Sequence, residues 1–214
     1  MLFIELFVPR GARTRAELQD LAERLTAARL LDGAEGDTER ADPGVMRLVE
    51  SRTHVVVHEP AVWITDGRPA DPAEPPCYVV NVHVGAWVKE VSEHIVAAVT
   101  REIAAAEGDP DGVYRQPRAL VQVFGVPRGG YGILGRVQRE ADWTAEIEQA
   151  ADPGREAPPG TFIDPVCGGI VPAESAVTLT RDGVTYGFCC PGCRGHFAKR
   201  LDERGEQGER AGVS

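Results

Sequence analysis

The sequence predicts an α+β protein with two parts, a duplicated β-α-β domain and a small cysteine-rich domain built from a hairpin and a helix. An apolar strand, an amphipathic helix and a second strand occur in that order twice within residues 1–140. A segment rich in Pro, Gly and charged residues follows, and four of the five cysteines then lie between residues 167 and 193. A length of 214 residues with 43% hydrophobic content is enough for one large domain or two smaller ones with a packed core.

The first β-α-β repeat covers about residues 1–70. An apolar strand is predicted over 2–8 and a second strand over 53–59. Between them, residues 15–31 show the 3.6-residue apolar period of an amphipathic helix. Its predicted buried face consists of Leu18, Leu21, Leu25 and Ala28.

The second repeat covers about residues 77–140 and has the same order. We predict a strand over 77–84, a helix over 88–106 and a strand over 119–127. The predicted buried face of this helix consists of Val91, Ile95, Val99 and Ile103. The repeats also end alike, with AVWITDGR after the first and YGILGR after the second.

Two such repeats can pair their strands into one four-stranded sheet with both helices on one face. Apolar and polar residues alternate poorly along the predicted strands, which is typical of a sheet buried on both faces. The helices cover one face, so the other face needs a partner. The sequence therefore predicts a homo-oligomer.

In this duplicated order and in the two matching endings, residues 1–140 resemble the tautomerase superfamily, which includes 4-oxalocrotonate tautomerase and macrophage migration inhibitory factor. The resemblance implies a trimer and an N-terminal proline as general base or nucleophile. Leu2 stands where that proline is expected, and so large a residue after Met1 makes removal of Met1 unfavourable. Pro75 and Pro76, before the second repeat, lie inside the chain, where a proline nitrogen is a non-basic amide. The resemblance thus implies a tautomerase-like fold without its usual activity.

Other family positions carry over as weak catalytic candidates. Arg13 matches an arginine that binds a substrate carboxylate, and Trp63 matches an aromatic residue near the active site. His54 falls where a second arginine is common, and His54 or His58 would have to replace the proline as base. A solvated Arg13, a structural Trp63 and structural histidines are the favoured interpretation. A tautomerase-type enzyme with a different base, in which the cysteine domain is structural, remains the alternative function.

The composition of the chain limits the classes of partner that we expect it to bind. The net charge of −10 argues against nucleic acid and anionic membranes as partners, and no apolar run approaches the length of a membrane span. The N-terminal residues lack the features of a signal peptide, so we expect a cytoplasmic protein. In a reducing compartment, clustered cysteines more often bind metal or perform redox chemistry than form a disulfide framework.

The domain boundaries follow from the change in composition. Residues 1–143 are predicted to form the tautomerase-like domain, and residues 144–160 a linker. Residues 161–203 form the cysteine-rich domain, and residues 204–214 a disordered tail.

The cysteine spacing predicts a metal site. Cys167, Cys189 and Cys193 follow a C-x21-C-x3-C pattern, whose long spacer can fold out as a hairpin while the thiolates converge on one soft ion. Three thiolates suit Cu(I) or Hg(II), whereas Zn(II) requires a fourth ligand, for which Cys190 and His196 are the candidates. We expect Cu(I) or Zn(II). A redox pair in Cys190-Pro191-Gly192-Cys193 is an alternative that lacks the βαβ context of such motifs, and Cys77 is expected to be a buried apolar residue.

Residues 161–203 resemble the YHS domain and the related TRASH metal-binding motif. DPVCG at 164–168, TYGFC at 185–189 and CRGHF at 193–197 carry this resemblance, with a hairpin expected around Asp182-Gly183. Gly169 and Cys190 depart from the pattern, which commonly has Met and Ser there. The resemblance implies metal handling, sensing or delivery, with a metal-trafficking protein as a potential partner. A core of about 40 residues is too small to be stable alone, so a bound metal would contribute folding energy.

Overall fold

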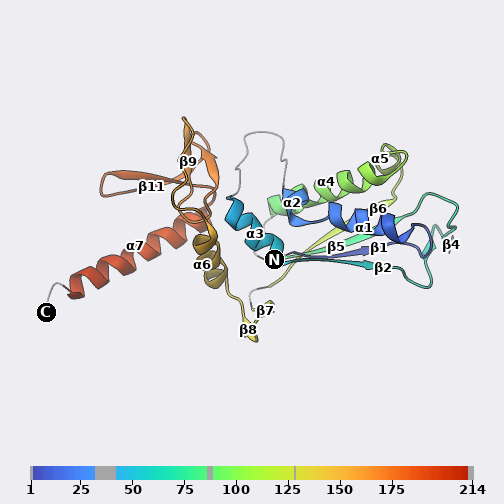
Figure 1. Cartoon of the computed structure of the whole chain (residues 1–214), viewed down its shortest axis with the longest axis horizontal. Coiled ribbons are helices and arrows are strands. Elements are labelled where there is room, and N and C mark those ends of the chain that lie inside the picture. Colours follow the sequence, from blue (N-terminus) through green and yellow to red (C-terminus); the bar gives the residue numbers. More distant parts are fainter. Residues whose placement is uncertain (1, 32–41, 86–88, 128, 212–214) are drawn as a thin grey trace. The chain divides into compact units, whose positions relative to one another are not determined.

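The computed structural model describes residues 2–31, 42–85, 89–127 and 129–211 (Figure 1). The chain divides into two compact units. The first comprises Met1–Ala34 and Val49–Tyr131 and is called the sheet unit below. The second comprises Glu35–Leu48 and Gly132–Ser214 and is called the cysteine unit. Within the described residues, no helix is both long enough and apolar enough to cross a membrane.

The sheet unit contains the predicted four-stranded sheet. Its strand order is β2-β1-β5-β6. The outer strands run parallel to their neighbours, and the central pair is antiparallel. The strand bounds are Leu2–Phe7 for β1, Thr53–His58 for β2, Tyr78–Val84 for β5 and Ala119–Gly125 for β6.

The register of the strands supports the internal duplication. Leu2 pairs with Thr53 at the start of the first half, and Tyr78 pairs with Ala119 at the start of the second. The backbone N–H of Leu2 donates to the carbonyl of Arg52, and that of Tyr78 donates to the carbonyl of Arg118. Tyr78 is therefore the structural equivalent of Leu2.

Helices lie on one side of this sheet (Figure 1). They are α1 (Arg15–Arg24), α2 (Ala27–Leu31), α4 (Lys89–Ala106) and the short α5 (Gly112–Arg115). Thr14 and Glu17 form a capping box that starts α1, since each side chain accepts a hydrogen bond from the other residue's backbone N–H. The helix α4 agrees with the helix predicted over 88–106.

The single helix predicted over 15–31 is interrupted. The N–H of Leu25 donates to the carbonyl of Ala22, and the hydroxyl of Thr26 donates to the carbonyl of Glu23, so local bonds replace the helical ladder. The break rotates the residues that follow. Ala28, predicted to be buried, is exposed, and Ala27 and Leu30 are buried instead.

The core lies between the helices and one face of the sheet. Burial alternates along the two central strands, because every second side chain points toward the helices. These strands alternate where the sequence analysis expected poor alternation. The buried core includes Leu2, Ile4, Leu6, Tyr78, Val80, Val82, Leu18, Leu21, Leu25, Ile95, Val99 and Ile103. The side chain of Val91, also predicted for this core, lies outside the described residues.

Each β-α-β repeat is followed by the same kind of tight hairpin. Strands β3 (Ile64–Thr65) and β4 (Arg68–Pro69) flank Asp66 and Gly67, whose φ angles are 51° and 75°. Strands β7 (Gly132–Ile133) and β8 (Arg136–Val137) flank Leu134 and Gly135, with φ angles of 54° and 74°. Two consecutive positive φ values are typical of a type I′ turn. The two sequence endings therefore fold alike.

The cysteine unit is built from short hairpins and helices. Strands β9 (Thr161–Ile163) and β10 (Ile170–Pro172) pair, and β11 (Val177–Arg181) pairs with β12 (Val184–Phe188) around Asp182-Gly183. Helix α7 (Pro191–Ala211) follows β12, and helix α6 (Glu140–Ala150) precedes the hairpins. Val166, Phe188 and Phe197 form the small core.

Three helical segments differ from the sequence expectation. Helix α6 includes residues 144–150, the first part of the predicted linker 144–160. Helix α7 continues through residues 204–211, which were predicted to belong to a disordered tail. Helix α3 (Pro43–Ser51) lies between the helix predicted over 15–31 and the strand predicted over 53–59, where no element was predicted. Its start is fixed by Asp42, whose Oδ1 accepts from the N–H groups of Gly44 and Val45.

Candidate metal centre

The predicted ligands come together from a turn, the end of a strand and the start of a helix in the cysteine unit. Cys167 lies in the turn between β9 and β10. Cys189 directly follows β12, and Cys193 lies in the first turn of α7. All three side chains are half-buried.

The three sulfur atoms have a spacing that fits one metal ion. The Sγ of Cys189 lies 3.7 Å from that of Cys167 and 3.6 Å from that of Cys193. With a carboxylate oxygen of Asp164, the donor atoms all lie within 4.8 Å of one another. Thiolates about 2.3 Å from a tetrahedral ion are about 3.8 Å apart, so these thiols need little movement to share an ion.

Asp164 holds the two cysteine-bearing segments together. It is 1% exposed. One oxygen accepts from the N–H of Val166 at 2.8 Å and from that of Cys167 at 3.3 Å. The other accepts from the N–H of Cys189 at 2.9 Å. One buried carboxylate thus links the β9–β10 turn to the end of β12.

Hydrogen bonds among the cysteines lower the pKa of two thiols, Cys167 and Cys190. Hydrogen bonds from Cys189 and Cys193 lower the pKa of the Cys167 thiol. Burial raises the pKa of the Asp164 carboxyl, and negative charge at Cys167 adds to this shift. A cation bound among these groups would offset the charge that they hold in a partly buried position.

The two candidates for a fourth ligand lie differently. The Sγ of Cys190 accepts from the N–H of Cys193 at 3.4 Å, beside the group of four but not within it. The Nε2 of His196 lies 3.3 Å from an oxygen of Glu148 on α6. Asp164, which was not predicted from the sequence as a ligand, completes the group of four. Its position three residues before Cys167, with Pro165 between, is a turn signal that could have identified it.

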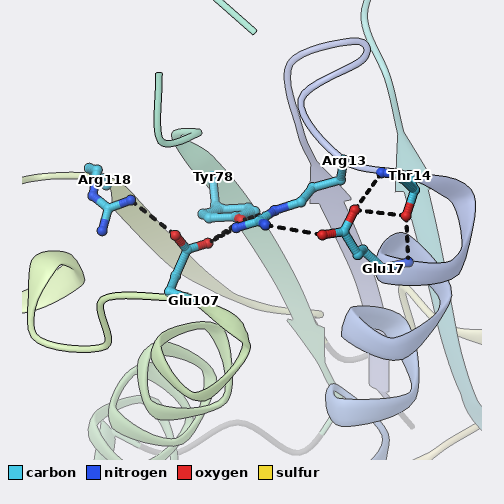
Figure 2. A network of polar contacts seen from close by, with 6 residues as sticks. All are labelled: Arg13, Thr14, Glu17, Tyr78, Glu107 and Arg118. Carbon is cyan, nitrogen blue, oxygen red and sulfur yellow. Dashed lines mark hydrogen bonds and ion pairs between the residues drawn. The ribbon is translucent and has the colours of Figure 1, made fainter. Parts of the chain in front are cut away.

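The sheet unit holds a second polar cluster around Arg13, drawn in Figure 2. The Nε of Arg13 donates to the hydroxyl of Tyr78 at 3.1 Å, and the Nη2 of Arg13 pairs with Glu107. Tyr78 donates to Glu107 at 2.5 Å, and Arg118 donates to the other oxygen of Glu107 at 3.1 Å. The side chains of Glu107 and Arg118 are only 5% and 8% exposed. Glu107 therefore acts as the counter-ion of both arginines.

A cavity of about 410 Å³ adjoins this cluster and is lined in part by Arg13, Pro76, Glu107, Gln116 and Arg118. Glu107 pairs with both arginines and Glu17 with Arg13, so these four side chains carry no net charge and leave little to attract a ligand carboxylate. Burial and the hydrogen bond to Glu107 raise the pKa of the Tyr78 phenol, so Tyr78 stays protonated there.

The other catalytic candidates are not gathered at this cavity. His54 is exposed on β2, and Trp63 is half-buried in the segment between β2 and β3. The ring of His58 stacks on Phe7 at 4.4 Å, and its Nε2 lies 3.3 Å from Glu5. Cys77, expected to be buried, is half-buried, with its Sγ 3.8 Å from the hydroxyl of Thr65.

Leu2 is 5% exposed and starts β1, where its N–H joins the sheet. The backbone N–H of Leu2 is therefore used in the sheet. The equivalent residue of the second repeat, Tyr78, contributes a phenol to the Arg13 cluster rather than a basic nitrogen.

No protein-family model matches the chain, and a search of curated proteins finds no significant match. Solved structures of tautomerase-superfamily members resemble it at low identity. A native fused 4-OT is 23% identical, with a TM-score of 0.47 over 63% of this chain and 94% of its own. MIF2 of Leishmania major is 14% identical, with a TM-score of 0.40 over 64% of this chain and 97% of its own. N1, a member of the cis-3-chloroacrylic acid dehalogenase family, is 14% identical, with a TM-score of 0.43 over 64% of this chain and 84% of its own. At such identities the likeness concerns the α+β fold alone.

Proposed function

We propose that this protein binds a soft metal ion, Cu(I) or Zn(II), through Cys167, Cys189 and Cys193, and serves in cytoplasmic metal handling, sensing or delivery. The observation that carries the proposal is the convergence of three thiols, 3.6 and 3.7 Å apart in two of the pairs, around the buried carboxylate of Asp164. Cysteine-rich segments of this size gain much of their stability from a bound ion. We regard residues 161–203 as a YHS/TRASH-like module.

The hydrogen bonds of Asp164 bear on the choice of metal. Both of its oxygens already accept backbone N–H groups, so the carboxylate is better used to orient the thiol-bearing loops than to fill a ligand position. Three thiolates without a fourth ligand suit Cu(I), whereas Zn(II) would have to recruit Asp164, Cys190 or water. We therefore expect Cu(I) to bind more tightly than Zn(II).

In this proposal the tautomerase-like part is a scaffold that has lost proline-based catalysis and assembles as a trimer. Leu2 starts β1 where a basic proline would have to stand, and Arg13 is paired with Glu107. The scaffold would present the metal module to a metal-trafficking protein.

Anaerobic titration of the purified protein with Cu(I) and with Zn(II) tests the proposal. We expect one ion per chain for the wild type and for Cys77→Ser, the control that removes the thiol outside the cluster. A triple variant of Cys167, Cys189 and Cys193 to Ser should lose this binding. Equally weak binding by the wild type and the triple variant would refute the proposal.

A further inference from the structure

A fourth thiol, Cys190, stands at the junction between β12 and α7. Its carbonyl accepts from the N–H of Arg194 at 3.2 Å, and its Sγ accepts from the N–H of Cys193 at 3.4 Å. Cys190 thus occupies the N-cap position of α7, with its sulfur held over the first helical turn. The sulfur touches the backbone of one proposed ligand without belonging to the group of four.

The surroundings of the cluster differ between its two ends. Around Cys167, the residues Asp164, Val166 and Gly168 are buried. The residues that follow Cys190, Pro191 and Gly192, are exposed, as is Arg194 beyond Cys193. An ion arriving from solvent therefore meets the Cys190–Cys193 end of the cluster before it meets Cys167.

A soft ion moves between thiolates by adding an incoming sulfur before an earlier one leaves. An ion held by three thiolates keeps room for a further ligand, so a nearby extra thiolate opens such a path. The Cys190 thiol hydrogen-bonds with the thiols of Cys189 and Cys193, which places its sulfur beside the cluster. A thiol in that position can assist exchange without being required in the final complex.

We propose that Cys190 is an exchange thiol, which receives a soft metal ion together with Cys193 and passes it to Cys167 and Cys189. This inference rests on the metal-binding function proposed above. On arrival, the thiols of Cys190 and Cys193 release their protons to solvent as their sulfur–metal bonds form, and the bonds between the ion and its carrier break. The bond to Cys190 breaks as Cys167 and Cys189 release any proton they hold to solvent and bind the ion, and the Cys190 thiolate takes up a proton again. Release of the ion follows the reverse order, and no electron is transferred.

The test compares exchange rates with equilibrium affinity. Serine is a good N-cap residue, so Cys190→Ser should preserve the start of α7 while removing the sulfur. Cu(I) would be supplied as its coloured bicinchoninate complex, and uptake and back-transfer would be followed by stopped-flow absorbance under anaerobic conditions. We expect Cys190→Ser to keep the equilibrium affinity of the wild type and to slow both transfers about tenfold. Cys77→Ser should match the wild type in both measurements.

Three results would overturn the inference. Unchanged rates in Cys190→Ser would remove any role in exchange, and a loss of affinity as large as that of Cys193→Ser would make Cys190 a permanent ligand. If the wild type does not bind Cu(I), both the proposed function and this inference are refuted. The titration of the wild type against the triple variant detects that failure separately, because neither protein is changed at Cys190. Alkylation of the metal-free protein by iodoacetamide gives an independent readout. Mass spectrometry should find Cys190 modified before Cys167, and the opposite order would contradict its outer position.

Discussion

Asp164 organises the candidate metal centre through its hydrogen bonds. Its carboxylate accepts hydrogen bonds from the backbone of two segments. The donors are Val166 and Cys167 on one segment and Cys189 on the other. Burial of an ionised carboxylate is costly unless such donors are present, and here both oxygens are used. The position of two of the three thiols therefore depends on a side chain that need not touch the metal.

Replacing this carboxylate should weaken both the fold of the cysteine unit and its metal binding. In Asp164→Asn one oxygen becomes an amide N–H2 group that faces a backbone donor, so at least one backbone N–H loses its acceptor. We expect a loss of about 1–3 kcal/mol in the free energy of unfolding. Loss of an outer partner typically costs about 10–100-fold in metal affinity. Urea unfolding of the metal-free protein and Cu(I) competition titration measure the two effects.

The matched control is Asp182→Asn, at the exposed tip of the β11–β12 hairpin. Asparagine tolerates the positive φ of that position, so this variant should behave as the wild type. Equal affinities for Asp164→Asn and the wild type would show that Asp164 does not orient the thiols.

In the sheet unit, the largely buried carboxylate of Glu107 is shared by two arginines. Its side chain is 5% exposed, and those of Arg13 and Arg118 are 17% and 8% exposed. Glu107→Gln would remove the counter-ion of the buried Arg118 and leave Arg13 with only the half-exposed Glu17. We expect a loss of about 3–5 kcal/mol in the free energy of unfolding, because uncompensated buried charge is strongly unfavourable. Chemical denaturation monitored by circular dichroism measures it.

Glu17→Gln is the comparison for this prediction. Glu17 also pairs with Arg13, but its side chain is 50% exposed. Loss of so exposed a pair should cost about 0–1 kcal/mol. An equal loss of unfolding free energy in Glu107→Gln and Glu17→Gln would mean that burial does not increase the contribution of Glu107 to stability.

At the scale of elements, the candidate metal centre depends on close packing between β12 and β9. Gly187 lies one residue before the end of β12, and a Cβ atom there would lie 2.3 Å from the Cγ of Phe162. Gly187→Ala would force Phe162 aside or shift β12, which carries Cys189 at its end. Overpacking of this kind typically costs about 1–3 kcal/mol, so the melting temperature of the metal-free protein should fall.

Gly195→Ala, on α7, provides the opposite control. A Cβ atom at Gly195 meets no atom within 4 Å. Alanine in a helix is more favourable than glycine by about 0.8–1.0 kcal/mol, so this variant should be more stable than the wild type. A fall in melting temperature for Gly195→Ala, or none for Gly187→Ala, would contradict this account of the packing.

The elements that the sequence predicted well are those whose signals are local. The four strands and α4 lie where they were predicted, and burial confirms the apolar period of α4, for example at Ile95 and Val99. The break at Leu25 was missed because the apolar period of the sequence continues through it. The hydrogen bond from the Thr26 hydroxyl to the backbone, which competes with the helix, leaves no mark on that period. Helix α3 was missed although Asp42-Pro43 is a helix-start signal. Cysteine spacing predicted the thiol cluster, whereas Asp164 was missed as a member because its bond to Cys189 joins segments far apart in sequence.

At the scale of the whole molecule, the face of the sheet opposite the helices leaves large apolar side chains in solvent. Val56, Leu120 and Phe124 on the outer strands are 38%, 53% and 41% exposed. On the same face the ring of His83 stacks on Phe124 at 5.1 Å, and Glu5 lies between His58 and His83. A sheet face with this much exposed apolar surface is typical of an interface, and we expect a second and a third copy of the chain to cover it.

A charge placed on this face should therefore prevent assembly. In Phe124→Glu, association would bury an unpaired carboxylate, which costs several kcal/mol and exceeds the apolar contribution of one side chain. We expect three chain masses for the wild type in light scattering coupled to gel filtration, and one for Phe124→Glu. Val62→Glu, at a side chain 76% exposed in the segment after β2, should leave the trimer intact.

Because the proposed ligands all lie in the cysteine unit, monomeric Phe124→Glu should still bind one Cu(I) per chain. Loss of that binding together with the trimer would mean that the metal site requires the assembly, and a monomeric wild type would contradict the role assigned to this face.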